Sequence, residues 1–475
     1  MKPFLVLVFF LFLLSCSVKK GAAVSNDPWE AIKKVMETVQ EPIFKNTIYN
    51  VSDFGAVSDG VFDNSLAFKK AIETCSQNGG GVVLVPQGNY FTGPIHLENN
   101  VNFHLSEGTQ ILFSTNSKDY PIVQTSFEGT ELMNYSPLIY ANNKHNIAVT
   151  GKGVFNGQSS NENWWAWVGN PRYGWKKGMP SQADPDNRAK LVDMAEQKIP
   201  VAARVFGEGH YLRPNFIEFF ECKDVLLKDV TIKNVPFWVI HPMKSINVTI
   251  DGVNIKSHGP NNDGCDPEYS KNVFIRNCTF DTGDDCIAIK SGRDADGRRV
   301  AIPSENIVVQ NCKMYDGHGG VTIGSEISAG VRNVFVENCV MDSPNLDRAI
   351  RIKTNSKRGG VTENVYVRNL EIGQVKESVL GIDMFYSVHG NQVGNFIPTV
   401  QNIFLENIKV KNGGDYGILA KGEKTSPIKN IRFKNVTIEK VETDYSVENV
   451  ENLKFISTYI NGSLMESPSN QKTKK

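Results

Sequence analysis

The sequence predicts an all-β protein, namely a parallel β-helix (a solenoid) with a short helical cap at its N-terminal end. The first observation is a repeated unit in which Asn precedes alternating apolar residues, as in residues 272–275 and 333–336. Period-2 alternation and Gly/Asn turns indicate short strands. The second observation is that successive units begin about 22 to 38 residues apart. This spacing is too variable for a propeller, and no leucine framework recurs, so stacked β-coils are favoured. The unit begins at further anchor residues, which are Asp224, Asn247, Asn306, Asn364, Asn402, Asn430 and Asn452.

The N-terminus predicts export. Lys2 precedes an apolar run over residues 4–14, which is too short to span a bilayer but suits the core of a signal peptide. The residues that follow resemble a bacterial lipobox ending at Cys16. Residues 1–16 are therefore expected to be a lipoprotein-type signal peptide, with Cys16 lipidated. Because Ser17 is not the Asp that signals inner-membrane retention, we expect a lipid anchor in the outer membrane. The alternative is an ordinary secretory signal.

Two helices are expected before the strands. Residues 17–45 are predicted to form a polar tether and an N-terminal helix. Asp27 is the expected N-cap, Pro28 is the first helical residue, and the helix is expected to end near Gln40. A second helix carries Phe68 and Ala71 at helical spacing, and the glycines at 79–81 stop it before a buried strand over residues 82–85. One of these helices is expected to cover the open end of the solenoid, because exposed strand edges need covering.

The β-helix domain is predicted over residues 46–462, followed by a polar tail at 463–475. An insertion at 158–211 interrupts the repeat. It carries Trp164, Trp165 and Trp167 and a helical-looking run over residues 187–197. Its length exceeds that of most structureless loops, which indicates a functional role.

Charge and cysteine content exclude several classes of function. The chain has 51 Lys+Arg and 51 Asp+Glu, so no overall field favours nucleic acid, and an anion-binding surface must be local. The seven cysteines after Cys16 show no CxxC or His-partner spacing, which argues against a disulfide framework and a zinc site. We expect them to be buried small hydrophobes, and we expect no metal or other cofactor.

The residues that carry chemistry recur at the ends of predicted strands, beside Gly-rich turns. They are Asp263 in Asn-Asp-Gly, Asp284 and Asp285 in Gly-Asp-Asp, His318 in Gly-His-Gly, and Arg351 and Lys353 in Arg-Ile-Lys. One Asp at such a turn is explained by hydrogen bonds to backbone amides. Three acids followed by a histidine and two cations are not explained in that way. The set indicates a glycosidase site for an acidic polysaccharide.

These four motifs, in this order, resemble glycoside hydrolase family 28, the polygalacturonases. The similarity covers about residues 47–462. The first motif reads Asn-Asn-Asp where the family usually has Asn-Thr-Asp. The difference is at Asn262, beside the carboxylate of Asp263. The resemblance implies a right-handed parallel β-helix and hydrolysis of α-1,4-galacturonosidic bonds of pectin with inversion. It also implies that Asp284 is the general acid, and that Asp263 and Asp285 hold and deprotonate the water.

The residue chemistry is consistent with that assignment. Glycoside hydrolysis needs one protonated carboxyl and one ionised carboxylate. Because Asp284 and Asp285 are adjacent, we expect repulsion to raise the pKa of one of them. His318 is expected to tune the carboxylates or contact substrate. Arg351 and Lys353 alternate on one strand and therefore share a face, where they would hold a sugar carboxylate. Asn261 and Lys290, which border these motifs, are also predicted to bind substrate, although Lys290 is equally compatible with a solvated loop.

The mode of attack is predicted to be exo. The insertion at 158–211 and the loop between Asp285 and His318 are candidate walls, in which aromatic rings would stack on sugars. Arg172, Lys176 and Lys177 would meet a terminal carboxylate. Three alternatives stay open: a rhamnogalacturonan or side-chain galacturonide hydrolase of the same family, a Ca²⁺-dependent β-helical pectate lyase, and a non-catalytic glycan-binding protein.

Overall fold

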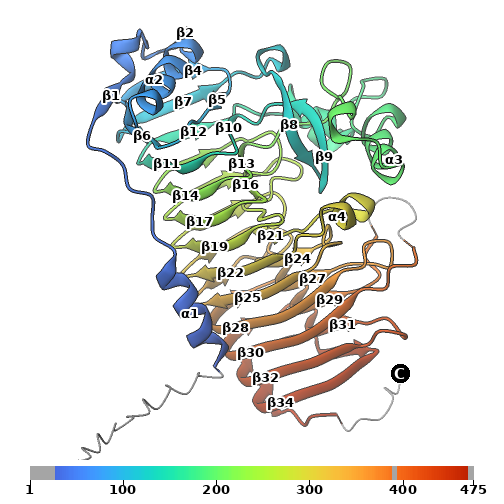
Figure 1. Cartoon of the computed structure of the whole chain (residues 1–475). Coiled ribbons are helices and arrows are strands. Elements are labelled where there is room, and N and C mark those ends of the chain that lie inside the picture. The colour runs from blue at the N-terminus through green and yellow to red at the C-terminus, as the bar shows by residue number, and fades with distance from the viewer. Residues whose placement is uncertain (1–26, 388–392, 469–475) are drawn as a thin grey trace, which may run out of the picture.

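The computed structural model describes residues 27–387 and 393–468 and shows a right-handed parallel β-helix (Figure 1). The predicted signal peptide, Cys16, most of the tether and the end of the polar tail lie outside the described residues. Within them, no helix is long and apolar enough to cross a membrane.

The solenoid consists of three strand ladders that run along its axis. The first contains β1 (Ile48–Asn50), β3 (Gly81–Val85), β6 (Val101–Leu105), β11 (His145–Gly151), β14 (Lys223–Lys228), β17 (Ile246–Asp251), β19 (Lys271–Arg276), β22 (Ser304–Gln310), β25 (Val331–Glu337), β28 (Val361–Gln374), β30 (Thr399–Asn412), β32 (Ile428–Ile438) and β34 (Val450–Ile460). The second contains β2 (Asp59–Asp63), β4 (Gly88–Thr92), β7 (Thr109–Phe113), β12 (Val154–Asn156), β15 (Thr231–Lys233), β18 (Asn254–Ser257), β20 (Thr279–Thr282), β23 (Lys313–Met314) and β26 (Val340–Asp342), and it merges into β28.

The third ladder carries the candidate site. It contains β5 (Ile95–His96), β10 (Ile139–Asn142), β13 (Ile217–Phe220), β16 (Ile240–Met243), β21 (Ile287–Ile289), β24 (Val321–Gly324), β27 (Arg348–Lys353), β29 (Ser378–Asp383), β31 (Tyr416–Lys421) and β33 (Thr443–Glu448). Between β16 and β21 the ladder narrows to single bridges, because Cys265 pairs with Ile240 on one side and with Ile287 on the other. The segment that contains Asp263 fills this place.

The Asn anchors of the repeat mark turns. Asn272 and Asn306 adopt left-handed backbone conformations, with φ of 57° and 58°, which Asn tolerates better than most residues. The side-chain amide of Asn306 donates to the side-chain oxygen of Asn272 at 3.0 Å, and the contact repeats from coil to coil up to Asn452. The sequence period therefore reflects a ladder of stacked Asn side chains at one corner of the solenoid.

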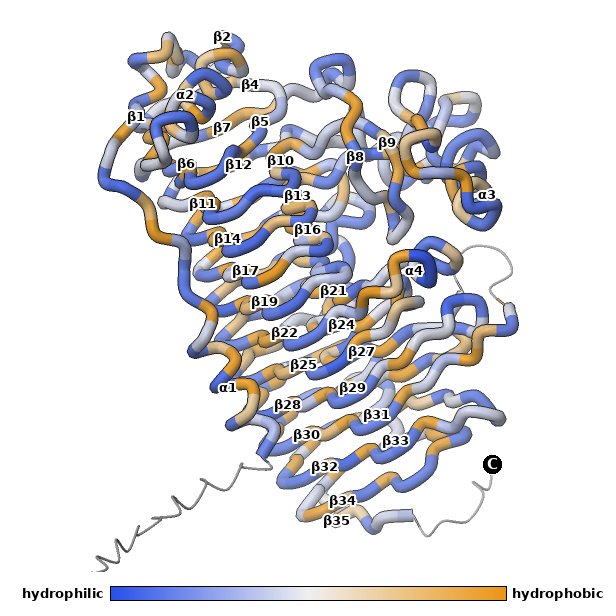
Figure 2. Tube along the Cα trace, in the orientation of Figure 1, coloured by the Kyte–Doolittle hydropathy of each residue, from blue (hydrophilic) through white to orange (hydrophobic). Residues whose placement is uncertain are grey.

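Apolar side chains from all three ladders fill the interior, and polar residues alternate with them along the chain (Figure 2). The seven cysteines of the described chain are all buried and free, as predicted. Cys278, Cys312 and Cys339 occupy equivalent positions in successive coils and face the same core. They pack as small hydrophobes.

The two N-terminal helices have different roles. α2 (Ser65–Gln77) covers the open end of the solenoid, where Phe68 packs on Phe103 with ring centroids 5.7 Å apart. α1 (Pro28–Thr38) lies along the side of the first ladder instead (Figure 1), and Trp29 contacts Phe335 at 5.2 Å. The predicted helices and the Asp27 cap are therefore confirmed, and α2 provides the cap.

Two excursions gather beside the third ladder. The antiparallel hairpin β8 (Ile122–Phe127) and β9 (Thr130–Tyr135), which the sequence analysis did not anticipate, leaves the second-ladder side. The insertion contains α3 (Lys190–Glu196), preceded by a π-helical turn over Pro185–Ala189. Both pack together through a small apolar cluster, which comprises Phe127, Leu132, Leu191, Phe206, Leu212, Phe237 and Trp238. The short elements outside the ladders are η1 (Val51–Phe54), η2 (Ser117–Asp119), η3 (Trp164–Val168), η4 (Pro171–Tyr173), η6 (Val201–Ala203), α4 (Asp294–Val300) and β35 (Ser463–Leu464).

Candidate active site

The predicted site residues meet on the outer side of the third ladder. Asp263 lies between β16 and β21, Asp284 and Asp285 in the turn before β21, and His318 in the turn before β24. Consecutive coils of a parallel sheet are about 4.8 Å apart, so equivalent turns stack directly. Residues far apart in sequence thus converge in one cavity of about 790 Å³. One oxygen from each of the three aspartates lies within 4.8 Å of the others.

Asp285 is completely buried and held by cations. Its two oxygens accept hydrogen bonds from Lys353 Nζ at 2.7 Å and from Thr322 Oγ1 at 2.8 Å, and Arg351 is 3.4 Å away. Burial alone would raise the pKa of Asp285, but Lys353, Arg351 and Lys290 outweigh it and hold that pKa well below its usual range. Asp285 is therefore an ionised carboxylate whose orientation is fixed.

Asp284 is paired with His318. The imidazole Nδ1 lies 2.9 Å from Oδ1 of Asp284. Burial favours the neutral acid, yet the hydrogen bond and charge of His318 lower the pKa of Asp284 overall. In turn, the hydrogen bond to Asp284 raises the pKa of His318 to about 9. At neutral pH the pair holds one proton, and in the free protein that proton lies on His318.

Asp263 differs from the other two aspartates. Burial, followed by repulsion from Asp284, raises its pKa well above the usual value. Lys290 comes no closer than 3.8 Å, and Oδ1 of Asp263 is buried without a hydrogen-bond partner among the described residues. The raised pKa expected within the adjacent pair thus falls on Asp263 instead. The reason is that Lys353 and His318 give each member of that pair its own cation.

Lys290 and Asn261 also line the cavity. The Lys290 ammonium is buried and lies 3.1 Å from Glu326 and 3.2 Å from the carbonyl oxygen of Gly324. The solvated-loop interpretation of Lys290 is therefore wrong. The side-chain oxygen of Asn261 accepts a hydrogen bond from buried Arg213 at 2.8 Å, which fixes this residue at the rim.

The tip of the β8–β9 hairpin forms a wall of the cavity and contacts residues that follow β21 and β24. Glu128 at this tip pairs with Arg293 at 2.7 Å and with Arg188 at 2.6 Å. The backbone amide of Arg293 donates to the carbonyl oxygen of Gly129 at 2.8 Å. Gly129 has φ +79°, and an added Cβ would lie 2.9 Å from the Glu326 side chain, so only glycine fits here.

The insertion also forms part of the wall, but not through the residues predicted. Tyr173, Gln182 and Arg188 are among its residues that line the cavity. Trp164 is buried and stacks edge-on against Tyr120 and Trp167.

Trp165 donates its indole N–H to the carbonyl oxygen of Val235. Arg172, Lys176 and Lys177 are exposed and do not line the cavity. The interpretation that these rings and cations face substrate is therefore wrong, because the aromatic residues anchor the insertion to the solenoid.

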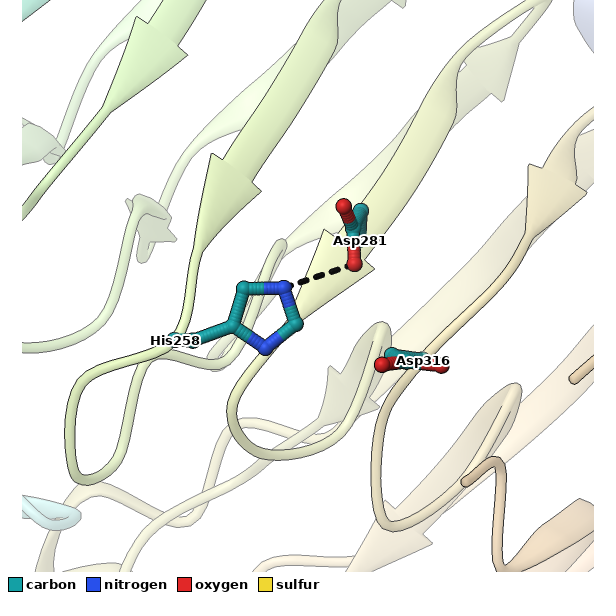
Figure 3. A group of neighbouring side chains, drawn as sticks. All are labelled: His258, Asp281 and Asp316. Carbon is teal, nitrogen blue, oxygen red and sulfur yellow. Dashed lines mark hydrogen bonds and ion pairs between the residues drawn. The ribbon is translucent and has the colours of Figure 1, made fainter. Parts of the chain in front are cut away.

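Two groups of side chains have the composition of a cation site. One is the trio of Asp263, Asp284 and Asp285. The other is formed by His258, Asp281 and Asp316, on the turns that precede the trio and His318 (Figure 3). In this second group His258 Nε2 lies 2.7 Å from Asp281, and Ser343 and Asn345 donate to Asp316. Protein donors already satisfy these carboxylates.

Sequence reasoning missed several residues of the site. The lining residues among them are Glu128, Trp238, Glu326 and Tyr386, and Thr322 is a buried partner of Asp285. Thr322 is found only through strand register, which places it beside Arg351 on the neighbouring strand. Glu128 and Tyr386 lie on excursions whose path no local pattern predicts.

Comparison with known proteins agrees with this geometry. The profile of "Glycosyl hydrolases family 28" matches residues 204–458, and that of "Rhamnogalacturonase A/epimerase, pectate lyase-like" matches residues 48–161. The chain belongs to glycosyl hydrolase family 28. It is therefore a glycosidase.

Three relatives are informative. A solved hyperthermoactive exopolygalacturonase from Thermotoga maritima superimposes with a TM-score of 0.89 at 43% identity, over 93% of this chain and 98% of that one. A probable polygalacturonase from Vitis vinifera is 28% identical over 81% of this chain and 73% of its own length. An exo-poly-α-D-galacturonosidase from Dickeya chrysanthemi is 27% identical over 77% of this chain and 61% of its own.

Proposed function

We propose that this protein is an exo-acting polygalacturonase that hydrolyses α-1,4-galacturonosidic bonds of pectin, a polysaccharide of plant cell walls, with inversion. One observation carries the proposal: three carboxylates and a protonated imidazole meet in a cation-lined cavity that a hairpin closes on one side. The relatives named exopolygalacturonase and exo-poly-α-D-galacturonosidase support the substrate and the mode of attack.

The Asp284–His318 pair supplies the acid. Departure of the leaving sugar requires a proton on the glycosidic oxygen. Asp284 faces the cavity, and the proton that it shares with His318 can pass across 2.9 Å to its carboxylate as the bond breaks. Asp284 is thus the residue that donates, and His318 resupplies the proton.

Asp263 and Asp285 supply the base. Asp263 lines the cavity, and its Oδ1 has no hydrogen-bond partner among the described residues, so its ionised form can accept a proton from water. The raised pKa makes that ionised form a stronger base, and it also requires Asp263 to release its own proton before the water is activated. Asp285 orients the same water. Lys353 and Thr322 occupy both oxygens of Asp285, which disfavours its use as a nucleophile, and this supports inversion. The short separation of the carboxylates is unusual for inverting enzymes, whose two carboxyl groups are typically about 6.5–9.5 Å apart.

The closed end supports exo attack from the non-reducing end. His318 and the strands beyond it lie towards the C-terminal coils, so the acid and the leaving sugar are placed on that side. The terminal sugar would then lie between Asp263 and the hairpin tip, where Glu128 is held by Arg188 and Arg293. Arg351 and Lys353 provide positive charge for galacturonate carboxylates.

Digestion of polygalacturonate tests the reaction class. We expect new reducing ends without ultraviolet absorbance from unsaturated sugars, and proton NMR should show the β-anomer first. Unsaturated products that disappear with chelator would identify a lyase, and binding without release of reducing ends would identify a glycan-binding protein. An α-anomer appearing first would mean retention and would remove the water-activating role from Asp263 and Asp285.

We further propose that the protein is exported and anchored to the bacterial envelope through a lipid on Cys16. The apolar segment before Cys16 and its likeness to a lipobox support this proposal. Expression in a bacterial host should place the full chain in the detergent phase of a Triton X-114 extraction, and Cys16→Ser should move it to the aqueous phase. Equal partitioning of the two forms would rule out the lipid anchor.

A further inference from the structure

The floor of the groove continues past the active site towards the C-terminal coils. Register along the third ladder places Lys353, Asp383 and Lys421 in one column, and Arg351, Gly381 and Leu419 in the column beside it. These positions alternate with the core residues Ile352, Ile382 and Ala420, so both columns face outward. The β8 strand of the hairpin contacts Glu218 and Glu268 on the N-terminal side, and the hairpin tip reaches Arg293.

A second, smaller hollow of about 60 Å³ lies over these columns. The two hollows are adjacent, because they share the lining residues Arg348, Arg351, Lys353 and Tyr386. Gly381, Leu419 and Lys421 line only the second. An added Cβ on Gly381 would lie 3.0 Å from the Arg348 side chain, so a larger residue would narrow the passage between them. The floor of the groove is thus a shallow track that leads from the three aspartates towards the C-terminal coils.

Lys421 differs from the other cations that line the two hollows. Lys290, Arg293, Arg351 and Lys353 all pair with acids, as do the remaining arginines. Within residues 27–387 and 393–468, no carboxylate lies within 4.0 Å of the Lys421 ammonium and no hydrogen bond to it is found. Its two column neighbours are both acids, Asp383 on β29 and Glu448 on β33, and Asp383 accepts the backbone amide of Phe385. Lys421 is exposed at the open end of the track.

We propose that Lys421 binds a carboxylate of the leaving chain, at a sugar beyond the first one after the cut. This inference rests on the proposed function. Lys421 is two strands past Lys353, or about 10 Å at about 4.8 Å per coil, and a polygalacturonate chain that lies along the track presents a carboxylate on every sugar. Because Lys421 is exposed beyond the carboxylates, the site recognises the polymer character of the substrate and not its terminus.

The test compares oligogalacturonates of two to five sugars. In the wild type, kcat/KM should increase when the sugar that reaches Lys421 is added. In Lys421→Ala this increase in kcat/KM should be smaller by roughly two- to fivefold, which corresponds to the free energy of one exposed ion pair. In Lys421→Glu the increase should be smaller still. Lys421→Arg should preserve it. Added NaCl should reduce the increase in the wild type and have little effect in Lys421→Ala.

Lys409 provides the matched control. It is exposed on β30, in the part of that strand that continues the second ladder, outside the groove, and has no partner among the described residues. Lys409→Ala should behave as the wild type with every oligomer. If Lys421→Ala and Lys409→Ala show the same dependence on chain length, the subsite is refuted even though galacturonate is released. If the wild type releases nothing from any oligomer, the proposed function itself fails.

Discussion

Two clusters of carboxylates and imidazole lie on the same ladder of this solenoid and have opposite access to solvent. In one, His241 bridges Glu218 at 3.1 Å and Glu268 at 2.9 Å, and all three side chains are fully buried. In the other, His318 pairs with Asp284 at 2.9 Å, and its side chain is 53% exposed to the cavity. In both, the neighbouring carboxylates raise the pKa of the histidine to about 9.

The hairpin explains the difference. Thr125 donates to Glu218 at 2.7 Å and Ser126 to Glu268 at 3.2 Å, so the β8 strand seals the first cluster and uses it as an anchor. The tip of the same hairpin, at Glu128, lines the cavity that the second cluster also lines. The same chemical groups therefore serve attachment where they are covered, and under the proposed function they serve catalysis where a cavity remains. Access, and not residue type, separates the two roles.

Asp284→Asn should show the largest effect of the variants considered. Loss of the donating carboxyl should lower kcat by roughly 10² to 10⁴ or more while the fold survives. Steady-state kinetics on polygalacturonate and circular dichroism measure the two outcomes. Asp281→Asn is the control, because Asp281 lies in the same turn region but contacts His258 outside the cavity. Near-wild-type turnover in Asp284→Asn would remove this residue from the acid role.

His241→Gln should show the converse behaviour, a loss of stability. Removing the imidazole leaves two buried carboxylates without their cation, which typically costs about 3–5 kcal/mol. Denaturant unfolding should show this destabilisation, whereas His318→Gln, at an exposed position, should be much less destabilised. If the two variants lose equal stability, burial does not distinguish the clusters.

The pH dependence should report His318. Since its folded pKa of about 9 exceeds the unfolded value near 6.5, its contribution to stability is complete below about 6.5 and is lost as pH rises through about 9. Activity should fall over the same alkaline range, because the proton for Asp284 disappears. His318→Gln should lack this alkaline limb and should be least stable, relative to the wild type, below pH 6.5. An unchanged alkaline limb in the variant would assign it to another group.

Much of this arrangement could be predicted from the sequence, and the missing part has a physical cause. The coils can be identified from the strand alternation and the Asn anchors, and the site residues from the order of the motifs. Residues at equivalent positions of successive repeats come into contact because the coils stack, and this brings the site residues together at Asp263 and Asp285. Which of the three aspartates has a raised pKa could not be predicted from the sequence. It depends on which carboxylates pair with Lys353 and His318 in the folded structure. The hairpin and the buried His241 cluster could not be predicted either, because neither is part of the repeated sequence pattern.

Chelation should have the smallest effect. The carboxylates near Asp284 are balanced by Lys353, Arg351 and His318, so hydrolysis is expected to need no added cation. Activity on polygalacturonate after dialysis against EDTA should match that of the untreated enzyme. A loss that only Ca²⁺ restores would transfer the role of these cations to a metal and favour the lyase alternative.

The central claim is that the hairpin closes one end of the groove and so separates an anchoring cluster from a catalytic one. The sizes of the first products from polygalacturonate, followed together with viscosity, test this most directly. A groove closed at Glu128 should release monomer or dimer from the first minute while viscosity falls slowly. A rapid fall in viscosity with a ladder of mid-length oligomers would contradict the claim, because it requires a groove open at both ends.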